Sequence, residues 1–308
     1  MKFSFIFPGQ GSQAIGMGKE IYENFNEAKE LLHNASDALS VDFKKLLFEE
    51  NELINQSEFT QPAIVLNSLM CYLALKSKLN LEPNFSLGHS LGEFSALAVN
   101  SGFDFVDALK VVNIRGKLMQ EACNGKDVSM MVVLGLNDQI VEEICVGTQK
   151  DGLQIYAANY NCDGQIVVAG VREHLAKFES VFKEAGAKRA MLLNMSVASH
   201  CPILSSASIG LVSHLEATLK DKFKSVISNA TAKPYSSKNE ALNLLKDQLV
   251  KPVLYKQSIQ NSQSEIDIFV EFGSSVLKGI NKKITDKPTY SITDIKSLDE
   301  FLVFLEGK

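Results

Sequence analysis

The sequence lacks several features that would each indicate a particular class of protein. Its five cysteines form no C-x-x-C pair or other metal-ligand spacing, and their odd number argues against a disulfide framework and for a reducing compartment. Pro8 and Gly9 interrupt the first apolar run too early for a signal peptide. No apolar run approaches the roughly 18 residues of a membrane span, so we expect a soluble, cytoplasmic protein.

The chain also has no excess of positive charge, since its formal net charge is −5. This excludes a nucleic-acid binder of the basic kind, and it means that an acidic partner needs a local basic surface. The chain has 308 residues, 45% of them hydrophobic and 22% charged, which is typical of a globular protein of about two domains. We expect a monomer that binds neither nucleic acid nor membrane.

Strand-like and helix-like segments alternate along the chain, which indicates an α/β fold. The middle of the chain follows the order βαββαβ, with strands at 130–136, 153–158, 165–170 and 189–195 and helices at 137–149 and 172–186. This order is that of a ferredoxin-like unit. We therefore expect a small subdomain at residues 126–196, inserted into a large α/β subdomain formed by residues 1–125 and 197–308. The alternative is one continuous mixed sheet.

The first strand leads into a glycine-rich loop in which Gly9, Gly11 and Ala14 match the dinucleotide-binding spacing G-x-G-x-x-A. A dinucleotide site also needs a second strand that ends in Asp or Glu about 20 residues later. Residues 18–36 instead have a helical pattern, so the fingerprint is incomplete. Elsewhere in the large subdomain we expect strands at 2–7, 85–88, 268–272 and around 289, and helices at 17–33, 60–79, 91–100, 104–122 and 202–220.

The clearest chemical motif is "GHSLG", residues 88–92, which fits the nucleophile elbow G-x-S-x-G. In such an elbow a strand turns sharply into a helix, and the serine at the apex, here Ser90, is held in a strained conformation. The flanking glycines allow the strand and the helix to approach closely, and the helix N-terminus directs backbone N–H groups at the reacting centre. The alternative is a tight turn in which Ser90 only caps the helix.

A nucleophilic serine needs a base, and the chain offers five histidines: His33, His89, His174, His200 and His214. His33, His174 and His214 lie on helical segments, and the neighbour of Ser90, His89, is expected to pack structurally. His200 lies in a loop before Pro202, where the chain returns from the insertion. It is therefore the candidate base. No aspartate is placed to orient it, so a Ser–His dyad and a triad both stay open.

Arg115 lies in the middle of an apolar helical stripe. Six apolar or small residues fall within about 60° of it on a helical wheel, namely Ala108, Val111, Val112, Leu118, Met119 and Ala122. The opposite face carries Lys110, Asn113, Lys117 and Gln120. Burying an unpaired guanidinium is costly, so Arg115 either forms an internal salt bridge or binds the carboxylate of a substrate.

Six segments together resemble the malonyl-CoA:acyl carrier protein transacylases of fatty acid biosynthesis, nearly from end to end. They are "FPGQGSQ" at 7–13, "GHSLGE" at 88–93, "RGKLMQ" at 115–120, "ANYNCDGQIVVAG" at 158–170, "SHCP" at 199–202 and "EFGSSVLKG" at 271–279. The resemblance implies an α/β-hydrolase-like large subdomain with a ferredoxin-like insertion. It also implies a malonyltransferase that carries the acyl group on a serine and uses no metal or redox cofactor.

Carried over by position, the resemblance makes Ser90 the nucleophile and His200 the general base. Backbone N–H groups of Gln10 and Leu91 would form the oxyanion hole, and Arg115 would bind the malonyl carboxylate. The backbone carbonyl of Gln248, in "DQLVKPVLY", would orient the histidine. This implies that the glycine-rich loop stabilises charge on an acyl group and does not bind phosphate.

The chain departs from the family pattern at Lys251, Tyr255, Ser274, Ser275 and, next to the histidine, Ser199. A carrier protein of this kind is acidic, and the candidates for its docking surface are Lys188, Arg189, Lys251 and Lys256. Two other functions stay open. A serine esterase or thioesterase would share the elbow and the histidine but would give Arg115 no role, and a carrier-binding module would form no covalent adduct.

Overall fold

The computed structural model describes residues 1–307, whose strands form two separate sheets and not one continuous mixed sheet. The larger sheet has six strands in the order β10-β9-β1-β2-β7-β8, and the smaller has four in the order β4-β5-β3-β6. The larger sheet contains β1 (Phe3–Phe7), β2 (Phe85–Gly88), β7 (Lys222–Ile227), β8 (Pro234–Ser237), β9 (Ile268–Phe272) and β10 (Thr289–Ile292). The smaller contains β3 (Val128–Leu134), β4 (Ile155–Cys162), β5 (Gln165–Val171) and β6 (Arg189–Leu192).

The larger sheet is parallel from β10 to β7, and β8 runs antiparallel to β7. β1 lies between β2 and β9, and all five of its residues are buried, as is typical of a parallel strand covered on both faces. Phe7 pairs with Gly88, so β1 and β2 end at the same edge of the sheet. Open α/β sheets form their binding sites at this carboxyl-terminal edge.

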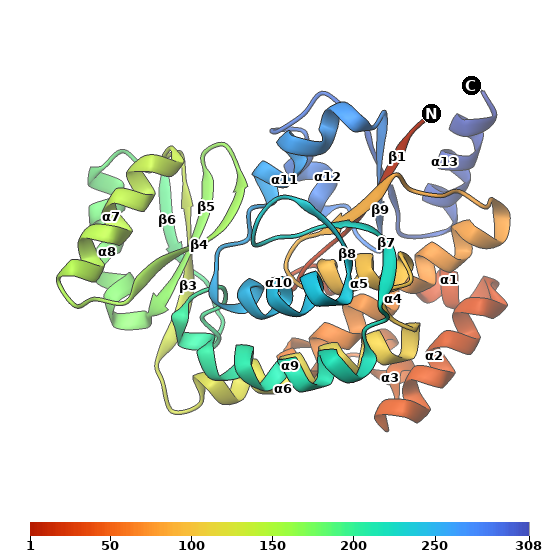
Figure 1. The fold of residues 1–308 in the computed structure, drawn as a ribbon, viewed down its shortest axis with the longest axis horizontal. Coiled ribbons are helices and arrows are strands. Elements are labelled where there is room, and N and C mark those ends of the chain that lie inside the picture. Colours follow the sequence, from red (N-terminus) through yellow and green to blue (C-terminus); the bar gives the residue numbers. More distant parts are fainter. Residues whose placement is uncertain (308) are drawn as a thin grey trace.

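The smaller sheet has the βαββαβ order that the sequence predicts, with α7 (Asp138–Lys150) after β3 and α8 (Arg172–Glu184) after β5. All its strand pairs are antiparallel, and the sheet lies with α7 and α8 at one side of the molecule (Figure 1). β3 begins earlier than expected because Val128 pairs with Val171 on β5. β6 ends at Leu192, earlier than expected.

Eleven further α-helices surround the larger sheet within residues 1–307. They are α1 (Lys19–Asn24), α2 (Asn26–Leu39), α3 (Phe43–Phe48), α4 (Ser57–Lys78), α5 (Gly92–Val99), α6 (Phe105–Cys123), α9 (Ser205–Thr218), α10 (Lys238–Val250), α11 (Tyr255–Ser262), α12 (Val276–Asn281) and α13 (Ile295–Glu306). The expected helix at 17–33 is two helices, because Phe25 has an extended backbone (φ −123°) between them. The expected helix at 202–220 begins as a 3₁₀ turn, Pro202–Leu204.

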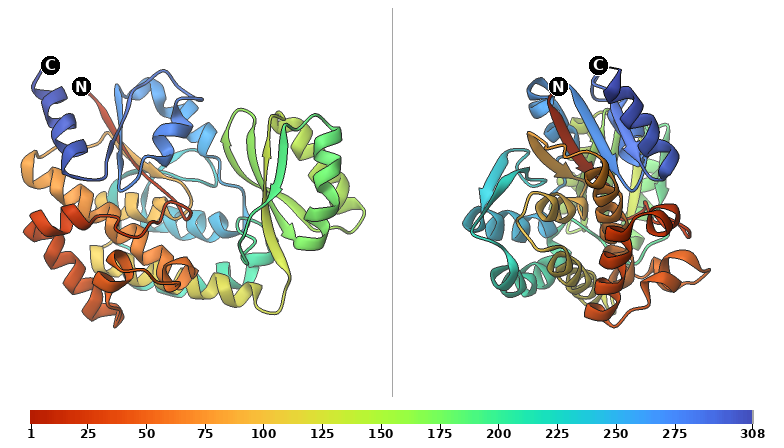
Figure 2. Two further views of the ribbon diagram at one scale, coloured as in Figure 1. Left: turned by 180° about the vertical axis from the view of Figure 1, so that it is seen from behind. Right: turned by 90° about the vertical axis from the view of Figure 1, so that its right-hand side faces the viewer.

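The helix α4 lies inside the protein and is buried along most of its length. It packs against α6, which also contacts α9 on another side, and Figures 1 and 2 show α6 and α9 running side by side. Because α6 is enclosed on two sides, its buried face is wider than the sequence predicts. Asn113, expected on the exposed face, is only 9% exposed and donates a hydrogen bond to the Glu58 carbonyl at 2.8 Å.

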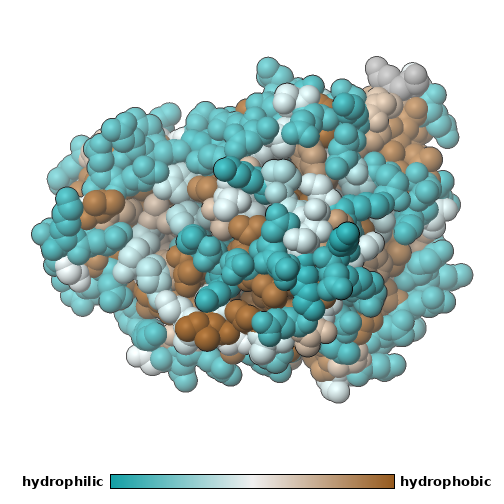
Figure 3. Space-filling model, in the orientation of Figure 1, coloured by the Kyte–Doolittle hydropathy of each residue, from teal (hydrophilic) through white to brown (hydrophobic). Residues whose placement is uncertain are grey.

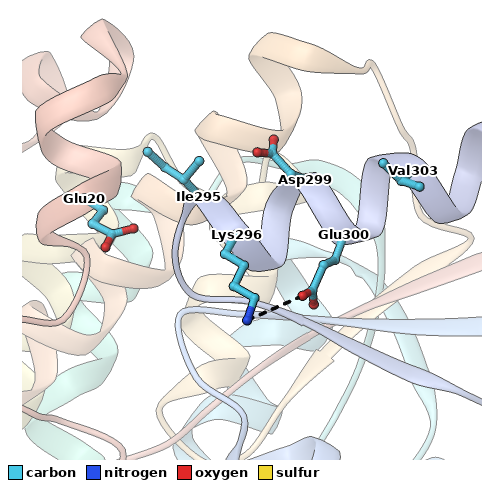
Figure 4. Close-up of a pocket in the computed structure, with 6 residues that line it drawn as sticks. All are labelled: Glu20, Ile295, Lys296, Asp299, Glu300 and Val303. Carbon is cyan, nitrogen blue, oxygen red and sulfur yellow. Dashed lines mark ion pairs between the residues drawn. The ribbon is translucent and has the colours of Figure 1, made fainter.

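Hydrophilic residues cover most of the face seen in Figure 3, with hydrophobic residues in small groups between them. A shallow hollow between α1 and α13 is lined by Glu20, Ile295, Lys296, Asp299, Glu300 and Val303 (Figure 4). It carries no nucleophile or histidine. Throughout residues 1–307 the helices are too short or too polar to cross a membrane.

Candidate active site

The predicted nucleophile elbow is present where β2 meets α5. Ser90 has φ 50°, in the left-handed region that residues other than glycine rarely adopt. Asn229 holds this turn, because its side chain accepts a hydrogen bond from the Ser90 N–H at 2.6 Å and donates one to the Gly88 carbonyl at 2.7 Å. A Cβ on Gly88 would lie 2.0 Å from the Gly92 carbonyl carbon, so only glycine lets the strand and the helix meet here.

The hydroxyl of Ser90 contacts the predicted base. Ser90 Oγ lies 2.7 Å from His200 Nε2, and His200 Nδ1 lies 2.7 Å from the backbone carbonyl oxygen of Gln248 on α10. A carbonyl oxygen only accepts, so Nδ1 carries the proton and Nε2 is left to accept the hydrogen of the serine. The group behind the histidine is therefore a backbone carbonyl and not a carboxylate.

The environment of His200 keeps its imidazole neutral. The side chain is 2% exposed, and burial, followed by the positive charge of Arg115, lowers its pKa to about 3. Its backbone has φ 62°, so both members of the Ser–His pair lie in the left-handed region. Such strain is concentrated at functional sites, where the surrounding structure maintains it.

Arg115 reaches the same serine from α6. Its Nη2 donates to Ser90 Oγ and to Gln248 Oε1, both at 3.1 Å, and its Nη1 donates to Gln61 Oε1 at 2.9 Å. The guanidinium lies 5.3 Å from the centre of the Phe94 ring. Within residues 1–307 it forms no ion pair with a carboxylate, and its buried Nε has no partner. These contacts favour an anion-binding guanidinium over the structural salt bridge.

The loop after β1 packs directly on the elbow. A Cβ on Gly9 would lie 2.6 Å from the His89 carbonyl oxygen, so this glycine is needed for the close contact. Gln10 is exposed and its side chain donates to Ser57 Oγ at 3.0 Å, while Leu91 is buried at the start of α5. Among the described residues neither backbone N–H of this pair has a protein acceptor. Both remain available to an oxyanion.

Several buried polar residues around the site were not predicted from the sequence. Glu93 accepts hydrogen bonds from the Asn229 N–H at 3.0 Å, from Gln248 Nε2 at 2.7 Å and from the Tyr235 hydroxyl at 2.8 Å. Gln61 binds Arg115 from the interior of α4. One signal was available for Glu93, because it is a charged residue in an otherwise apolar helix, "GEFSALAV".

The remaining histidines lie outside the site or support it. His89 Nε2 donates to Asn161 Oδ1 on β4 at 2.8 Å, and its ring centre lies 5.6 Å from that of Tyr255. His174 Nδ1 accepts from the Gln154 N–H at 3.0 Å. Both His33 and His214, which the sequence places on helical segments, are exposed.

One of the four basic residues that the sequence offers for carrier docking is buried and therefore wrong for that role. Lys256 is 8% exposed, and its ammonium pairs with Asp138 and, at 3.1 Å, with Asp163. It connects α11 to the start of α7 and to the turn between β4 and β5. The exposed Lys251 pairs with Asp247 at 2.8 Å, whereas Lys188 and Arg189 are exposed.

The cysteines supply no rival nucleophile. All five are buried and free, and burial raises the pKa of Cys71 and of Cys201 to about 12. A thiol of that pKa carries almost no reactive thiolate near neutral pH. Across residues 1–307 no group of His, Cys, Asp and Glu side chains has a metal-binding arrangement.

The Ser90 hydroxyl lies at a nucleophile elbow and contacts both a neutral histidine and a buried arginine, and the adjoining loop and helix carry two backbone N–H groups without acceptors. This combination is typical of an acyl transferase. The family model described as "Acyl transferase domain" matches residues 4–294. A crystal structure of malonyl-CoA:acyl carrier protein transacylase from Helicobacter pylori is 49% identical, with a TM-score of 0.96 and coverage of 99% of both chains.

Two curated proteins named malonyl CoA-acyl carrier protein transacylase are also similar. The Haemophilus influenzae protein is 35% identical, covering 98% of this chain and 99% of its own, and the Bacillus subtilis protein is 34% identical, covering 97% and 95%. A further solved structure, a type II PKS acyl-carrier protein in complex with its malonyl-transacylase, has a TM-score of 0.94 and 32% identity over 100% of both chains. This chain belongs to the malonyl-CoA–acyl carrier protein transacylase family.

Proposed function

We propose that this protein transfers the malonyl group of malonyl-CoA to the phosphopantetheine thiol of acyl carrier protein, through a malonyl ester on Ser90. One observation carries the proposal. Ser90 Oγ is shared by a general base, His200 Nε2 at 2.7 Å, and by a buried cation, Arg115 Nη2 at 3.1 Å. An acyl group that also bears a carboxylate is the substrate that needs both.

In the first half-reaction the neutral His200 takes the proton of Ser90 as Oγ attacks the thioester carbonyl. The N–H groups of Gln10 and Leu91 stabilise the resulting oxyanion, and Arg115 binds the malonyl carboxylate as a bidentate donor. The tetrahedral intermediate expels coenzyme A, whose sulfur receives the proton from His200. The product is malonyl-Ser90.

In the second half-reaction the carrier thiol takes the place of coenzyme A. His200 removes the thiol proton as the sulfur attacks the malonyl ester, and the proton returns to Ser90 Oγ as the ester bond breaks. The Gln248 carbonyl keeps Nδ1 protonated in both directions. All these steps use groups of this chain and of the two substrates, without a metal or redox cofactor.

The division into subdomains belongs to the same proposal. Residues 1–125 and 197–308, of which Lys308 lies outside the described residues, would form the α/β-hydrolase-like subdomain around the larger sheet. Residues 126–196 would form a ferredoxin-like subdomain around the smaller one. The sheet order β4-β5-β3-β6 and the placement of both sheets in Figure 1 support this division. The cytoplasmic location and the monomeric state stay predictions.

The rival functions are separated by how the acyl group leaves the enzyme. A thioesterase would pass it to water, and a carrier-binding module would never become acylated. The contacts of Arg115 with Ser90 and with two glutamines favour transfer, because an esterase without a carboxylate substrate has no use for them.

Intact-mass spectrometry after mixing the protein with malonyl-CoA tests the proposal. We expect one malonyl adduct, located on Ser90 by peptide mapping and lost when holo acyl carrier protein is added. The Ser90→Ala variant should form no adduct. An adduct on Cys201 or Cys71, or release to water faster than to the carrier thiol, would contradict the proposal.

A further inference from the structure

Glu93 is a fully buried carboxylate beside the site that the proposed reaction does not use. Three donors converge on it. Gln248 Nε2 and the Asn229 N–H donate to Oε2 at 2.7 and 3.0 Å, and the Tyr235 hydroxyl donates to Oε1 at 2.8 Å. An ionised carboxylate only accepts hydrogen bonds, so this set of partners fits the charged form.

The side-chain amide of Gln248 connects Glu93 to the cation of the site. Its Nε2 donates to Glu93 and to the Ser90 carbonyl, the latter at 3.0 Å, while its Oε1 accepts from Arg115 Nη2 at 3.1 Å. If the amide were reversed, its NH₂ would face the guanidinium and its oxygen would face the carboxylate. Both contacts would then be repulsive, so Glu93 determines which end of the amide Arg115 meets.

We propose that Glu93 is a positioning residue for malonyl transfer: it holds the Gln248 amide with its oxygen toward Arg115 and thereby fixes the guanidinium that receives the substrate carboxylate. This inference rests on the proposed function. We expect the effect to be specific to malonyl transfer, because only an acyl group that bears a carboxylate offers Arg115 an anion to bind. Acetyl transfer uses Ser90 and His200 but has no group for Arg115 to bind.

The charge of Glu93 is sensitive to pH near neutrality. Burial raises its pKa to about 7, although the donors from Asn229, Gln248 and Tyr235 and the charge of Arg115 all lower it. Tyr235 on β8 and Arg115 on α6 are the titratable groups that act on it, since the other two partners do not titrate. Protonation would remove the charge-assisted bond to the Gln248 amide and loosen it.

The experiment measures kcat/KM for the formation of acyl-Ser90 from malonyl-CoA and from acetyl-CoA and takes the ratio of the two. Because His200 acts on both thioesters, any pH dependence that it contributes cancels in this ratio. In the wild type we expect the ratio to fall between about pH 8 and about pH 6 as Glu93 protonates. In Glu93→Gln we expect a ratio about fivefold lower at pH 8 that no longer changes with pH, because a neutral acceptor holds the amide less firmly. Tyr235→Phe removes one donor to the carboxylate, raises its pKa and should shift the midpoint of the profile upward.

Two further measurements separate positioning from a structural role. Glu93→Gln should melt at pH 8 no lower than the wild type, since it replaces a buried charge with an amide whose NH₂ can donate to the Tyr235 hydroxyl. In a Gln248→Met background, Glu93→Gln should change the ratio no further, because the two residues act through one amide.

A wild-type ratio that does not change with pH overturns the proposal, as does an unchanged ratio in Glu93→Gln. Equal losses for both thioesters together with a lower melting temperature also overturn it. Each of these three results presupposes that the wild type still forms malonyl-Ser90, so each would reject the role of Glu93 and leave the proposed function intact. If the wild type does not form that ester, the proposed function itself is rejected. If Glu93→Gln does not fold, the proposal is tested by the pH profile of the wild-type malonyl-to-acetyl ratio and by the shift of its midpoint in Tyr235→Phe.

Discussion

The two histidines near Ser90 differ in what they contact, so their substitutions should have different effects. His200→Ala removes the base and should lower kcat/KM by about 10²–10⁴-fold, the usual contribution of general acid–base catalysis. His89→Ala removes the contacts with Asn161 and Tyr255 and should mainly lower the melting temperature. Steady-state rates and melting curves of both variants provide the comparison, and the reverse pattern would assign the base to His89.

Arg115 should govern the choice of acyl group. Arg115→Ala removes the charge-assisted bond to the malonyl carboxylate, a loss of about 1.5–3 kcal/mol or roughly 10–150-fold in kcat/KM for malonyl-CoA. Acetyl-CoA has no carboxylate, so its transfer should stay level or rise. We expect the malonyl-to-acetyl preference to fall by at least about tenfold.

The control for Arg115→Ala is its melting curve. A structural arginine would give equal losses for both thioesters and a clearly lower melting temperature. We expect neither result, because Arg115 donates only to Gln61, Ser90 and Gln248 and has no direct carboxylate partner within residues 1–307.

At the scale of elements, the loop after β1 and the elbow after β2 must fit closely. Gly9→Ala would place a methyl group 2.6 Å from the His89 carbonyl oxygen and push the loop that carries Gln10 away from Ser90. A displacement of about 1 Å at a catalytic group can cost on the order of 10²-fold in rate, and we expect a loss of about 10–100-fold.

Gly147→Ala is the matched control for this substitution. A Cβ at Gly147, on α7, would meet nothing within 4 Å, and alanine favours a helix over glycine by about 1 kcal/mol. This variant should keep full activity and melt at the same or a higher temperature. Wild-type rates in Gly9→Ala would show that the loop does not contribute to the reaction.

Glu271 connects three elements at the edge of the larger sheet. On β9, it accepts from the N–H groups of Leu277 and Lys278 at the start of α12, and from Ser291 on β10. Burial raises its pKa to about 7 from 4.5, so its contribution to stability is complete below about pH 4.5 and is lost as the pH rises through about 7.

The Glu271→Gln variant lacks this titration and leaves a backbone N–H facing an amide NH₂, at a cost of about 1–3 kcal/mol. It should be less stable than the wild type, by a margin that narrows between about pH 5 and about pH 8. Denaturant unfolding at several pH values measures this margin. A margin that widens with pH would mean that the native carboxylate binds its proton less tightly than the unfolded one.

Much of the site could be predicted from the sequence because its main residues lie in short local patterns. The strand, turn and helix around Ser90 are contiguous, and the wheel around Arg115 needs only one helix. Glu93, Asn229 and Tyr235 could not be placed in this way, because each meets its partners across more than a hundred residues of chain. The break between α1 and α2 at Phe25 also could not be predicted, since the apolar pattern continues through both helices.

At the scale of the whole molecule, Lys256 joins α11 to α7 and to the turn between β4 and β5. Lys256→Ala would leave Asp138, whose side chain is 22% exposed, without its cation, and we expect the free energy of unfolding to fall by about 1–3 kcal/mol. Lys251→Ala is the control, because its exposed pair with Asp247 should contribute about 0.5 kcal/mol or less. Equal effects in chemical denaturation would show that these ion pairs of Lys256 add nothing to the stability.

The central position of β1 has a consequence for the newly made chain. β2 can cover one edge of this apolar strand early, but the other edge awaits β9, whose first residue is Ile268. At ribosomal rates the delay is on the order of tens of seconds, during which an unpaired hydrophobic edge is open to aggregation. The loop that carries Gln10 is attached to that strand, so a nascent chain interrupted before β9 would have neither a closed sheet nor an ordered acyl site.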